Sequence, residues 1–324
     1  MRLIFILLII TTCSLQSQSY APAAGQVGST AIAADSALFV SWATGVSIER
    51  GYVDISNPDY QANGSNFTTY GEPDNAIGPA TNSAVSLGDG GQAILTFDSP
   101  IKDGPGFDFA VFENSFSDFY LELAFVEVSS NGIDFFRFPS HSQTQTEIQV
   151  EGFDELDPTY INNLAGKYRA MFGTPFDLAE LQEDPLLDKN NITHIKIIDV
   201  VGSLDINYAS YDSHGNIIND PFTTPFHSGG FDLDAVGVIN EQLLGVEEKE
   251  SKKFQVYPNP AVTQLFIRNS NSSQAKVYDM GGRLVCSKQL NKDDFIDVSN
   301  LPNGVYVLML IFNDTVSQHR FLKQ

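Results

Sequence analysis

Hydrophobic residues between positions 86 and 138 fall into four short runs separated by turns rich in Gly, Pro, Asp and Asn. In the first two runs apolar and polar residues alternate, a period-two pattern typical of strands with one buried face. The residues on the apolar parity are Ala93, Leu95, Phe97, Phe107, Phe109 and Val111. In 121–128 both parities are apolar, which predicts either a strand buried on both faces or a bulge near Phe125. Asn131-Gly132 predicts a hairpin into the fourth run.

Outside these runs, residues 157–171 and 177–187 are the only stretches predicted as helices, the second with Asp177 as N-cap and Glu180 as capping-box partner. Few helices and about eight strands indicate an all-β fold, a jelly-roll-like β-sandwich over residues 20–245. Four more apolar runs predict the remaining strands, at 37–43, 45–55, 192–201 and 230–240.

A charged linker, residues 246–253, separates this domain from a second one. Residues 254–324 contain short apolar runs joined by Pro-Asn, Gly-Gly and Pro-Asn-Gly turns. Such turns between short strands predict a small β-sandwich.

The N-terminus has the pattern of a secretory signal peptide, predicted to span residues 1–19. Met1-Arg2 is a short basic start, residues 3–12 are apolar, and Ser17-Gln18-Ser19 supplies small residues for cleavage. The apolar run is too short to cross a bilayer, which needs about 20 residues, and no later segment is a transmembrane candidate. Removal of the signal leaves Cys286 as the single thiol, so no internal disulfide is expected.

Charge is concentrated in the larger domain. The chain carries 40 acidic and 18 basic residues, a net charge of −22, and residues 1–245 hold 32 of the acidic and only 8 of the basic ones. This balance disfavours nucleic acid and anionic membrane surfaces as partners. Cations, cationic ligands and neutral sugars remain compatible.

Several motifs follow one another in the last 71 residues. They are Tyr257-Pro258-Asn259-Pro260, the run VYDMGGRLV with Gly281 and Gly282, the run LPNGVY with Gly304 and Tyr306, and a basic end, RFLK. Residues 254–324 thereby resemble the type A C-terminal sorting domain of the Bacteroidetes type IX secretion system. The resemblance implies export by the signal peptide into the periplasm and passage through the type IX translocon. The product would be secreted or held at the outer-membrane surface of a Gram-negative bacterium.

Residues 86–240 resemble, more loosely, secreted galactose-binding-like (discoidin-type) jelly-roll domains. The resemblance is carried by the runs SLGDGGQAILTF, FAVFEN and GFDLDAVGV. It implies a fold and no activity.

Acidic residues offer a candidate metal site in the larger domain. Asp232 and Asp234 are two apart on a predicted strand and so share one face, while Glu113 ends an apolar strand, where an unpaired carboxylate is costly. Ca²⁺ takes six to eight oxygen ligands. We expect one structural Ca²⁺ held by a subset of five carboxylates; the other interpretation is solvated or Arg-paired acids. The five are Asp74, Asp89, Glu113, Asp232 and Asp234.

Two weaker metal patterns lie in the predicted loop 207–229. DSHGNIIND lacks the spacing and the terminal Glu of an EF-hand loop. His214 within this run and His227 after it have Asp nearby, but no zinc-site spacing supports them, so solvent-facing histidines are the preferred interpretation.

Aromatic residues near the long polar loop 56–83 are candidates for ligand binding: Trp42, Tyr52 and Tyr70. Trp42 is also explained by core packing. No nucleophile elbow, phosphate loop or dinucleotide fingerprint is present. The sequence therefore favours a non-catalytic binding module for a glycan or another small nutrient. The alternatives are a polysaccharide hydrolase with a carboxylate pair and a purely structural or adhesive surface protein.

Overall fold

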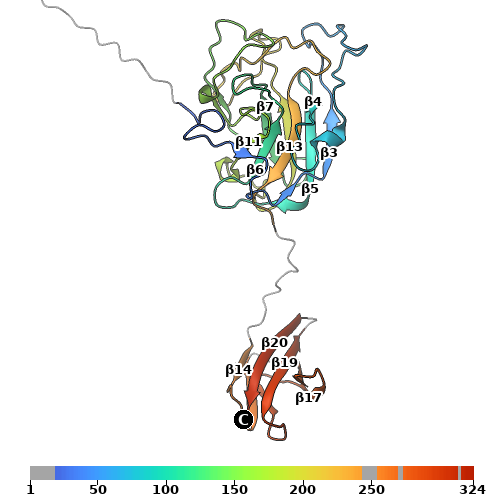
Figure 1. Cartoon of the computed structure of the whole chain (residues 1–324), viewed down its shortest axis with the longest axis vertical. Helices are drawn as coiled ribbons and strands as arrows, with labels where there is room; N and C mark the ends of the chain where they lie inside the picture. Colours follow the sequence, from blue (N-terminus) through green and yellow to red (C-terminus); the bar gives the residue numbers. More distant parts are fainter. Residues whose placement is uncertain (1–18, 243–253, 269–272, 313–314) are drawn as a thin grey trace, which may run out of the picture. The chain divides into compact units, whose positions relative to one another are not determined.

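The computed structural model describes residues 19–242, 254–268, 273–312 and 315–324. They form two compact units, divided between residues 243 and 244, and each is described by itself (Figure 1). The predicted linker and all of the predicted signal peptide except Ser19 lie outside the described residues.

The larger unit is built on two antiparallel sheets. One has the order β1-β11-β6-β13-β2, with β4 also paired to β13. Its strands are β1 (Ile32–Ala33), β11 (Phe172–Phe176), β6 (Phe109–Glu113), β13 (Asp232–Val238), β2 (Ser41–Trp42) and β4 (Val85–Ser86). The other has the order β3-β5-β12-β7-β8. Its strands are β3 (Gly45–Glu49), β5 (Gln92–Ile101), β12 (Ile192–Asp199), β7 (Ala124–Ser129) and β8 (Phe136–Arg137). A separate pair joins β9 (His141–Ser142) to β10 (Ile161–Asn162).

The two sheets enclose one hydrophobic core, to which alternate residues of their strands contribute. It includes Leu95, Phe109, Val111, Val126, Ile195, Leu233 and Val236. The prediction of an all-β fold, a jelly-roll-like sandwich followed by a small β-sandwich, is confirmed.

Strand β7 is buried along its whole length. Ala124, Val126 and Val128 face the central core, whereas Phe125 packs in a second cluster with Leu121 and Leu123. Its pairing with β12 runs without a register shift. Burial on both faces therefore explains the double apolar parity of 121–128, and the bulge interpretation is wrong. The predicted hairpin after β7 is confirmed by its pairing with β8.

Both predicted helices are wrong. The helical segments that form there are two 3₁₀ turns, η2 (Pro158–Tyr160) and η3 (Leu178–Glu180), and residues 161–162 of the first stretch belong to β10. A further 3₁₀ turn, η1 (Pro73–Ala76), lies elsewhere. In the first stretch Asn163 and Gly166 have positive φ, and a Cβ at Gly166 would lie 1.8 Å from the Glu122 carbonyl oxygen, so the chain needs this glycine and cannot continue a right-handed helix. In the second, Asp177 does accept from the Ala179 N–H as predicted. The Glu180 carboxylate, however, bonds to the Asn163 side chain instead of closing a capping box.

The smaller unit is a sandwich of a three-stranded and a four-stranded sheet, ordered β14-β15-β18 and β17-β16-β19-β20. The strands are β14 (Gln255–Tyr257), β15 (Gln264–Arg268), β16 (Gln274–Asp279), β17 (Leu284–Gln289), β18 (Asp294–Asp297), β19 (Gly304–Phe312) and β20 (Thr315–Lys323). Its own core includes Leu265, Ile267, Val277, Leu308 and Phe321. Among the described residues of the chain, no helix is long and apolar enough to span a membrane.

Candidate functional site

Three carboxylates from separate strand ends meet at one end of the larger sandwich. Glu113 ends β6, Asp232 begins β13, and Glu122 lies two residues before β7. One oxygen from each lies within 4.8 Å of the others, and the side chains are only 1%, 7% and 7% exposed for Glu113, Glu122 and Asp232. We call these three residues the acidic triad.

Few hydrogen-bond donors serve the acidic triad. Glu113 accepts from the Ser115 N–H at 2.7 Å, and Asp232 accepts from the Ser86 hydroxyl. The Asn114 side chain lies between Glu113 and Asp232; with its amide nitrogen turned toward them it donates to both, at 3.2 Å each. The second oxygens of these two carboxylates thus share one neutral donor.

Three further acids lie around the acidic triad. Asp89 accepts from the Ile55 N–H at 2.9 Å, and Asp199 accepts from Phe231 N–H at 2.7 Å and Gly90 N–H at 2.9 Å. These two carboxylates tie loops to the sheets. Asp220 accepts from the Leu123 N–H at 2.8 Å through one oxygen, while its other oxygen is buried without a hydrogen-bond donor.

Burial raises the pKa values of all three carboxyls of the acidic triad, and charge repulsion adds to the rise at Glu113 and Glu122. Burial, and then the charge of Asp232, raise the pKa of Glu113 well above its ordinary value, and burial followed by the charges of Asp232 and Glu113 does the same for Glu122. Burial raises the pKa of Asp232 to about 7, against the lowering effect of the Ser86 and Asn114 hydrogen bonds and of the Arg50 charge. The Arg50 guanidinium is itself bound to the carbonyl oxygens of Tyr70, Gly71 and Ser86.

A pocket of about 460 Å³ opens over the acidic triad. Glu122, Asp232 and Asn114 line it together with aromatic side chains. The aromatic members are Tyr70, Phe116, Tyr120, Phe153, Phe226 and His227. We call it the aromatic pocket.

Four of these rings stand in a row. Phe116 stacks on Tyr120 with ring centroids 4.6 Å apart, Tyr120 lies 5.9 Å from Phe153, and Phe153 lies 5.6 Å from Phe226. Phe116 is 72% exposed and Phe153 is 67% exposed. Apolar rings this exposed and this close together are typical of a binding surface.

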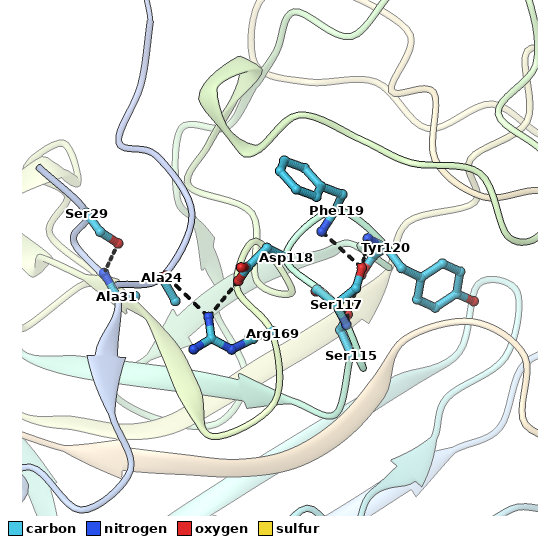
Figure 2. Close-up of polar contacts among 9 residues, drawn as sticks. All are labelled: Ala24, Ser29, Ala31, Ser115, Ser117, Asp118, Phe119, Tyr120 and Arg169. Atoms are coloured by element: carbon cyan, nitrogen blue, oxygen red, sulfur yellow. Dashed lines mark hydrogen bonds and ion pairs between the residues drawn. The ribbon is translucent and has the colours of Figure 1, made fainter. Parts of the chain in front are cut away.

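The loop after β6 holds two of these rings in place. The Ser117 hydroxyl accepts from the Phe119 and Tyr120 N–H groups, and the Ser115 hydroxyl donates to the carbonyls of Ser117 and Tyr120. On one side of the loop, Asp118 pairs with Arg169 at 2.7 Å, and Arg169 also donates to the Ala24 carbonyl. Figure 2 shows the Tyr120 ring pointing away from this ion pair. Burial, and then the adjacent Glu122 carboxylate, raise the pKa of the Tyr120 hydroxyl.

Of the sequence-predicted ligand-binding residues, only Tyr70 lines the aromatic pocket. Tyr52 packs on Phe67, with ring centroids 4.8 Å apart. Trp42 packs on Phe39 and Phe112 at 4.9 and 5.5 Å, and its exposed edge lines a second pocket beside β2. Trp42 thus has a packing role, which was one of the two interpretations of this residue.

Of the five predicted metal-binding residues, the structure brings together Glu113 and Asp232. Asp74 lies exposed in η1, and Asp89 holds the Ile55 backbone. Asp234 accepts from three successive N–H groups, those of Thr81, Asn82 and Ser83, at 3.0–3.2 Å. Asp234 therefore ties the long loop before β4 to β13.

Replacement of Asp234 by Ala is expected to destabilise the larger unit by about 2 kcal/mol, because three charge-assisted hydrogen bonds are lost. Asp234→Asn keeps one acceptor oxygen and is expected to cost less. Urea unfolding of both variants measures the difference. An unchanged midpoint for Asp234→Ala would contradict the anchoring role.

Sequence reasoning missed Glu122 and the aromatic residues Phe116, Tyr120, Phe153 and Phe226, and it considered Asp220 only as the last residue of the loop DSHGNIIND. Glu122 carried a usable signal, since it is an acid between two leucines, Leu121 and Leu123, that are fully buried. The rings come from three separate loops, and no spacing in the sequence relates them.

The structure does not bring together His214 and His227, the pair considered in the sequence. His214 lies against His141, with ring centroids 4.2 Å apart, and His227 lies 6.0 Å from Tyr70. Asp212 is within reach of His141 and His214. Its carboxylate, however, already accepts four hydrogen bonds, three from backbone N–H groups and one from the Asn216 amide. These bonds explain Asp212 as an organiser of its loop.

The motifs of the smaller unit each have a structural role. Asn259 of the Tyr-Pro-Asn-Pro motif accepts from the Leu322 N–H at 2.9 Å and donates to the Arg320 carbonyl at 3.2 Å, which joins the start of the unit to its last strand. Gly281 and Gly282 form the turn between β16 and β17. Gly304 begins β19, and Tyr306 stacks on Phe321 and donates to the Pro302 carbonyl.

A family model described as a secretion system C-terminal sorting domain matches residues 255–324. This region is a sorting domain. Such a domain indicates export by the type IX secretion system, followed by release or attachment at the cell surface. The predicted sorting residues all fall within the matched region, including Tyr257, Pro258 and Pro260.

The similar proteins include one short match to a curated relative and several distant solved structures. A curated relative, beta-agarase D of Zobellia galactanivorans, is 41% identical over 58 residues, which are 18% of this chain and 12% of the agarase. Since the match spans about an eighth of the agarase, it does not transfer that protein's activity.

Two solved structures illustrate the distant matches. The BSP domain of a biofilm-associated protein has 13% identity and a TM-score of 0.21, over 72% of this chain and 48% of that one. A beta-glucuronidase from Ruminococcus gnavus has 8% identity and a TM-score of 0.18, over 71% of this chain and 35% of the glucuronidase. Scores of this size assign neither fold nor activity. The sorting domain accounts for delivery alone, so the chemistry of the larger unit depends on its own residues.

Proposed function

We propose that the larger unit is a non-catalytic extracellular binding module whose aromatic pocket takes a carbohydrate. The observation that carries this proposal is the row of Phe116, Tyr120, Phe153 and Phe226, three of them exposed, beside the carboxylates of Glu122 and Asp232. Rings supply flat apolar faces, and the carboxylates supply hydrogen-bond acceptors.

A sugar matches both features of the pocket. The C–H face of a pyranose ring removes aromatic surface from water when it stacks, at about 25 cal/mol per Å² of apolar surface buried. Its hydroxyl groups donate to carboxylates, which are stronger acceptors than neutral groups. The volume of about 460 Å³ is within the range of roughly 300–1,000 Å³ found for small-molecule pockets. Export by the sorting domain places such a module where glycans occur.

Substitution of the exposed rings tests the proposal. Phe116→Ala and Phe153→Ala are each expected to weaken glycan binding about tenfold, the equivalent of ~1.4 kcal/mol. Both side chains are largely exposed, so the melting temperature should change little. Glycan-array screening followed by calorimetry with the best ligand measures the effect.

Ile133→Ala is the matched control, because Ile133 is 81% exposed and does not line the aromatic pocket. Equal losses of glycan binding in Phe116→Ala and Ile133→Ala would show that the aromatic pocket is not the glycan-binding site. The absence of any bound glycan would favour the structural or adhesive alternative.

A polysaccharide hydrolase remains the second candidate, because Glu122 and Asp232 both line the pocket and both have raised pKa values. A carboxyl with a raised pKa suits general acid catalysis. Glycoside hydrolysis, however, needs two carboxylates facing each other across a bond, at about 5–9.5 Å, whereas three carboxylates here converge within 4.8 Å. Release of reducing sugar by the wild type, lost in Glu122→Gln, would replace the binding proposal with this one.

A further inference from the structure

We propose that a Ca²⁺ ion binds at the floor of the aromatic pocket, held by Glu113, Glu122 and Asp232, and that its remaining coordination positions face the pocket ligand. The ion site stands on the geometry of the acidic triad. The contact between ion and ligand rests on the proposed carbohydrate-binding function.

The spacing of the acidic triad fits a calcium ion. Ca²⁺ binds oxygens at about 2.3–2.6 Å, so two ligand oxygens on opposite sides of the ion are about 4.6–5.2 Å apart. The three carboxylate oxygens here lie within 4.8 Å of one another. An all-oxygen set of acids is the set that Ca²⁺ takes, whereas Zn²⁺ prefers nitrogen and sulfur ligands.

A buried carboxylate oxygen without a hydrogen-bond donor, on Asp220, lies near the acidic triad. Asp220 is 3% exposed, and one of its carboxylate oxygens has no hydrogen-bond donor. Its other oxygen accepts from the N–H of Leu123, the residue after Glu122, and its charge acts on both Glu113 and Glu122. A buried carboxylate oxygen without a partner is costly, and a cation bound by the triad places positive charge near it.

Protein cations do not neutralise this cluster. Among the described residues, no ion pair involves Glu113, Glu122, Asp220 or Asp232. Arg50, whose charge acts on Asp232, directs its guanidinium nitrogens to three backbone carbonyls. Buried carboxylates are normally paired or bound to a metal.

Asn114 can add a fourth ligand. Its side-chain amide lies between Glu113 and Asp232. A rotation of this amide by 180° exchanges a nitrogen that donates to the two carboxylates for an oxygen that faces the same point. The residue therefore suits both the ion-free and the ion-bound protein.

The ion site is open to solvent and to a ligand, because Glu122, Asp232 and Asn114 line the aromatic pocket. Three carboxylates and one amide leave at least two of the six to eight positions of Ca²⁺ for water or ligand oxygens. Vicinal hydroxyl groups of a sugar held against the aromatic rings can supply these oxygen ligands. The ligand class deduced from the pocket is thus a polyhydroxylated one.

Direct titration of the mature full-length protein tests the ion site. After dialysis against EGTA, CaCl₂ is expected to bind at one site by calorimetry and to raise the melting temperature more than MgCl₂ does. TbCl₃ is expected to give tyrosine-sensitised emission, because the Tyr120 hydroxyl adjoins Glu122. Glu122→Gln and Glu113→Gln should each lower the affinity at least about tenfold, since each removes one charged ligand.

Glu147→Gln is the matched control, because Glu147 is exposed and outside the triad. The triad variants should be as stable as wild type in EGTA, since each removes a buried charge, so loss of binding will not reflect unfolding. No heat and no terbium emission up to millimolar metal, or an equal loss in Glu147→Gln, would overturn the ion site.

The double variant Phe116→Ala/Phe153→Ala separates this proposal from the proposed function. It is expected to keep Ca²⁺ binding and to lose the carbohydrate. If wild type binds Ca²⁺ but no glycan, the ion site stands and the proposed function fails; if it binds glycan equally well in EGTA, the role of the ion in ligand binding fails.

Discussion

In calcium-free buffer the larger unit is expected to lose stability as the pH rises from about 4 to about 8, with Asp89 as a main contributor. Burial raises the pKa of Asp89 from 3.8 to about 7, and the charge of Asp54 adds to this. A pKa difference of about three units between the folded and unfolded chain corresponds to at most about 4 kcal/mol in the free energy of unfolding. Burial likewise raises the pKa of Asp108 to about 6 and that of Asp199 well above its ordinary value.

The direction of this change in stability follows from proton binding. Below pH 4 Asp89 is protonated in both the folded and the unfolded chain, and its titration makes no difference to stability. Between pH 4 and 7 the folded chain holds the proton while the unfolded chain has released it, so the free energy of unfolding falls as pH rises. Above pH 7 the full cost of the buried charge is present.

Asp89→Asn tests this account. The Asn side chain keeps an oxygen that can accept from the Ile55 N–H, which Asp89 binds at 2.9 Å, but it has no titrating group. Urea unfolding at pH 5 and pH 8 in EGTA should show a smaller difference for Asp89→Asn than for wild type, with the gain at pH 8. Asp74→Asn, at an exposed position, is the control and should keep the wild-type pH dependence. A wild-type stability that is flat or rises over this range would contradict the prediction.

The strands were predictable because burial imposes a period of two on a sheet with one covered face. The alternation at Ala93 and Leu95 lies within β5, where buried and partly exposed residues alternate. Phe109 and Val111 lie within β6, which is buried on both faces. The two failed helices show the limit of local signals. Asp177 caps a single 3₁₀ turn, and residues 161–166 leave the helical conformation because Ala165 bonds to the backbone of Ala124 in both directions. A contact with a distant strand has overridden the local preference.

The candidate site was predictable only in part. Glu113 and Asp232 stood out as acids at the ends of apolar strands, and the pairing of β6 with β13 brings those ends together. Glu122 was not predicted as a site residue, because a single acid in an apolar run also fits a strand with one solvent-facing position. Phe116, Phe153 and Phe226 lie in separate loops, and only the folded chain makes them neighbours. Strand pattern records burial, whereas a site depends on which ends and loops meet.

Deletion of residues 254–324 is expected to abolish delivery outside the cell and to leave the truncated protein in the periplasm. The sorting domain occupies residues 255–324, and its hydrophobic core is separate from that of the larger unit. The truncated chain should therefore still fold. Fractionation of the bacterium, together with protease treatment of intact cells, measures where the protein accumulates.

Asn259→Ala provides a graded version of the same experiment. Asn259 joins the first motif of the sorting domain to its last strand through Leu322 and Arg320. Loss of both hydrogen bonds should cost about 1–3 kcal/mol within a small unit, so delivery should fall without being abolished. Ser299→Ala removes only local hydroxyl bonding to Asp297 and serves as the control. Normal surface delivery of the chain that lacks residues 254–324 would refute the role of the sorting domain, and equal delivery of Asn259→Ala and Ser299→Ala would show that the motif acts without this tie.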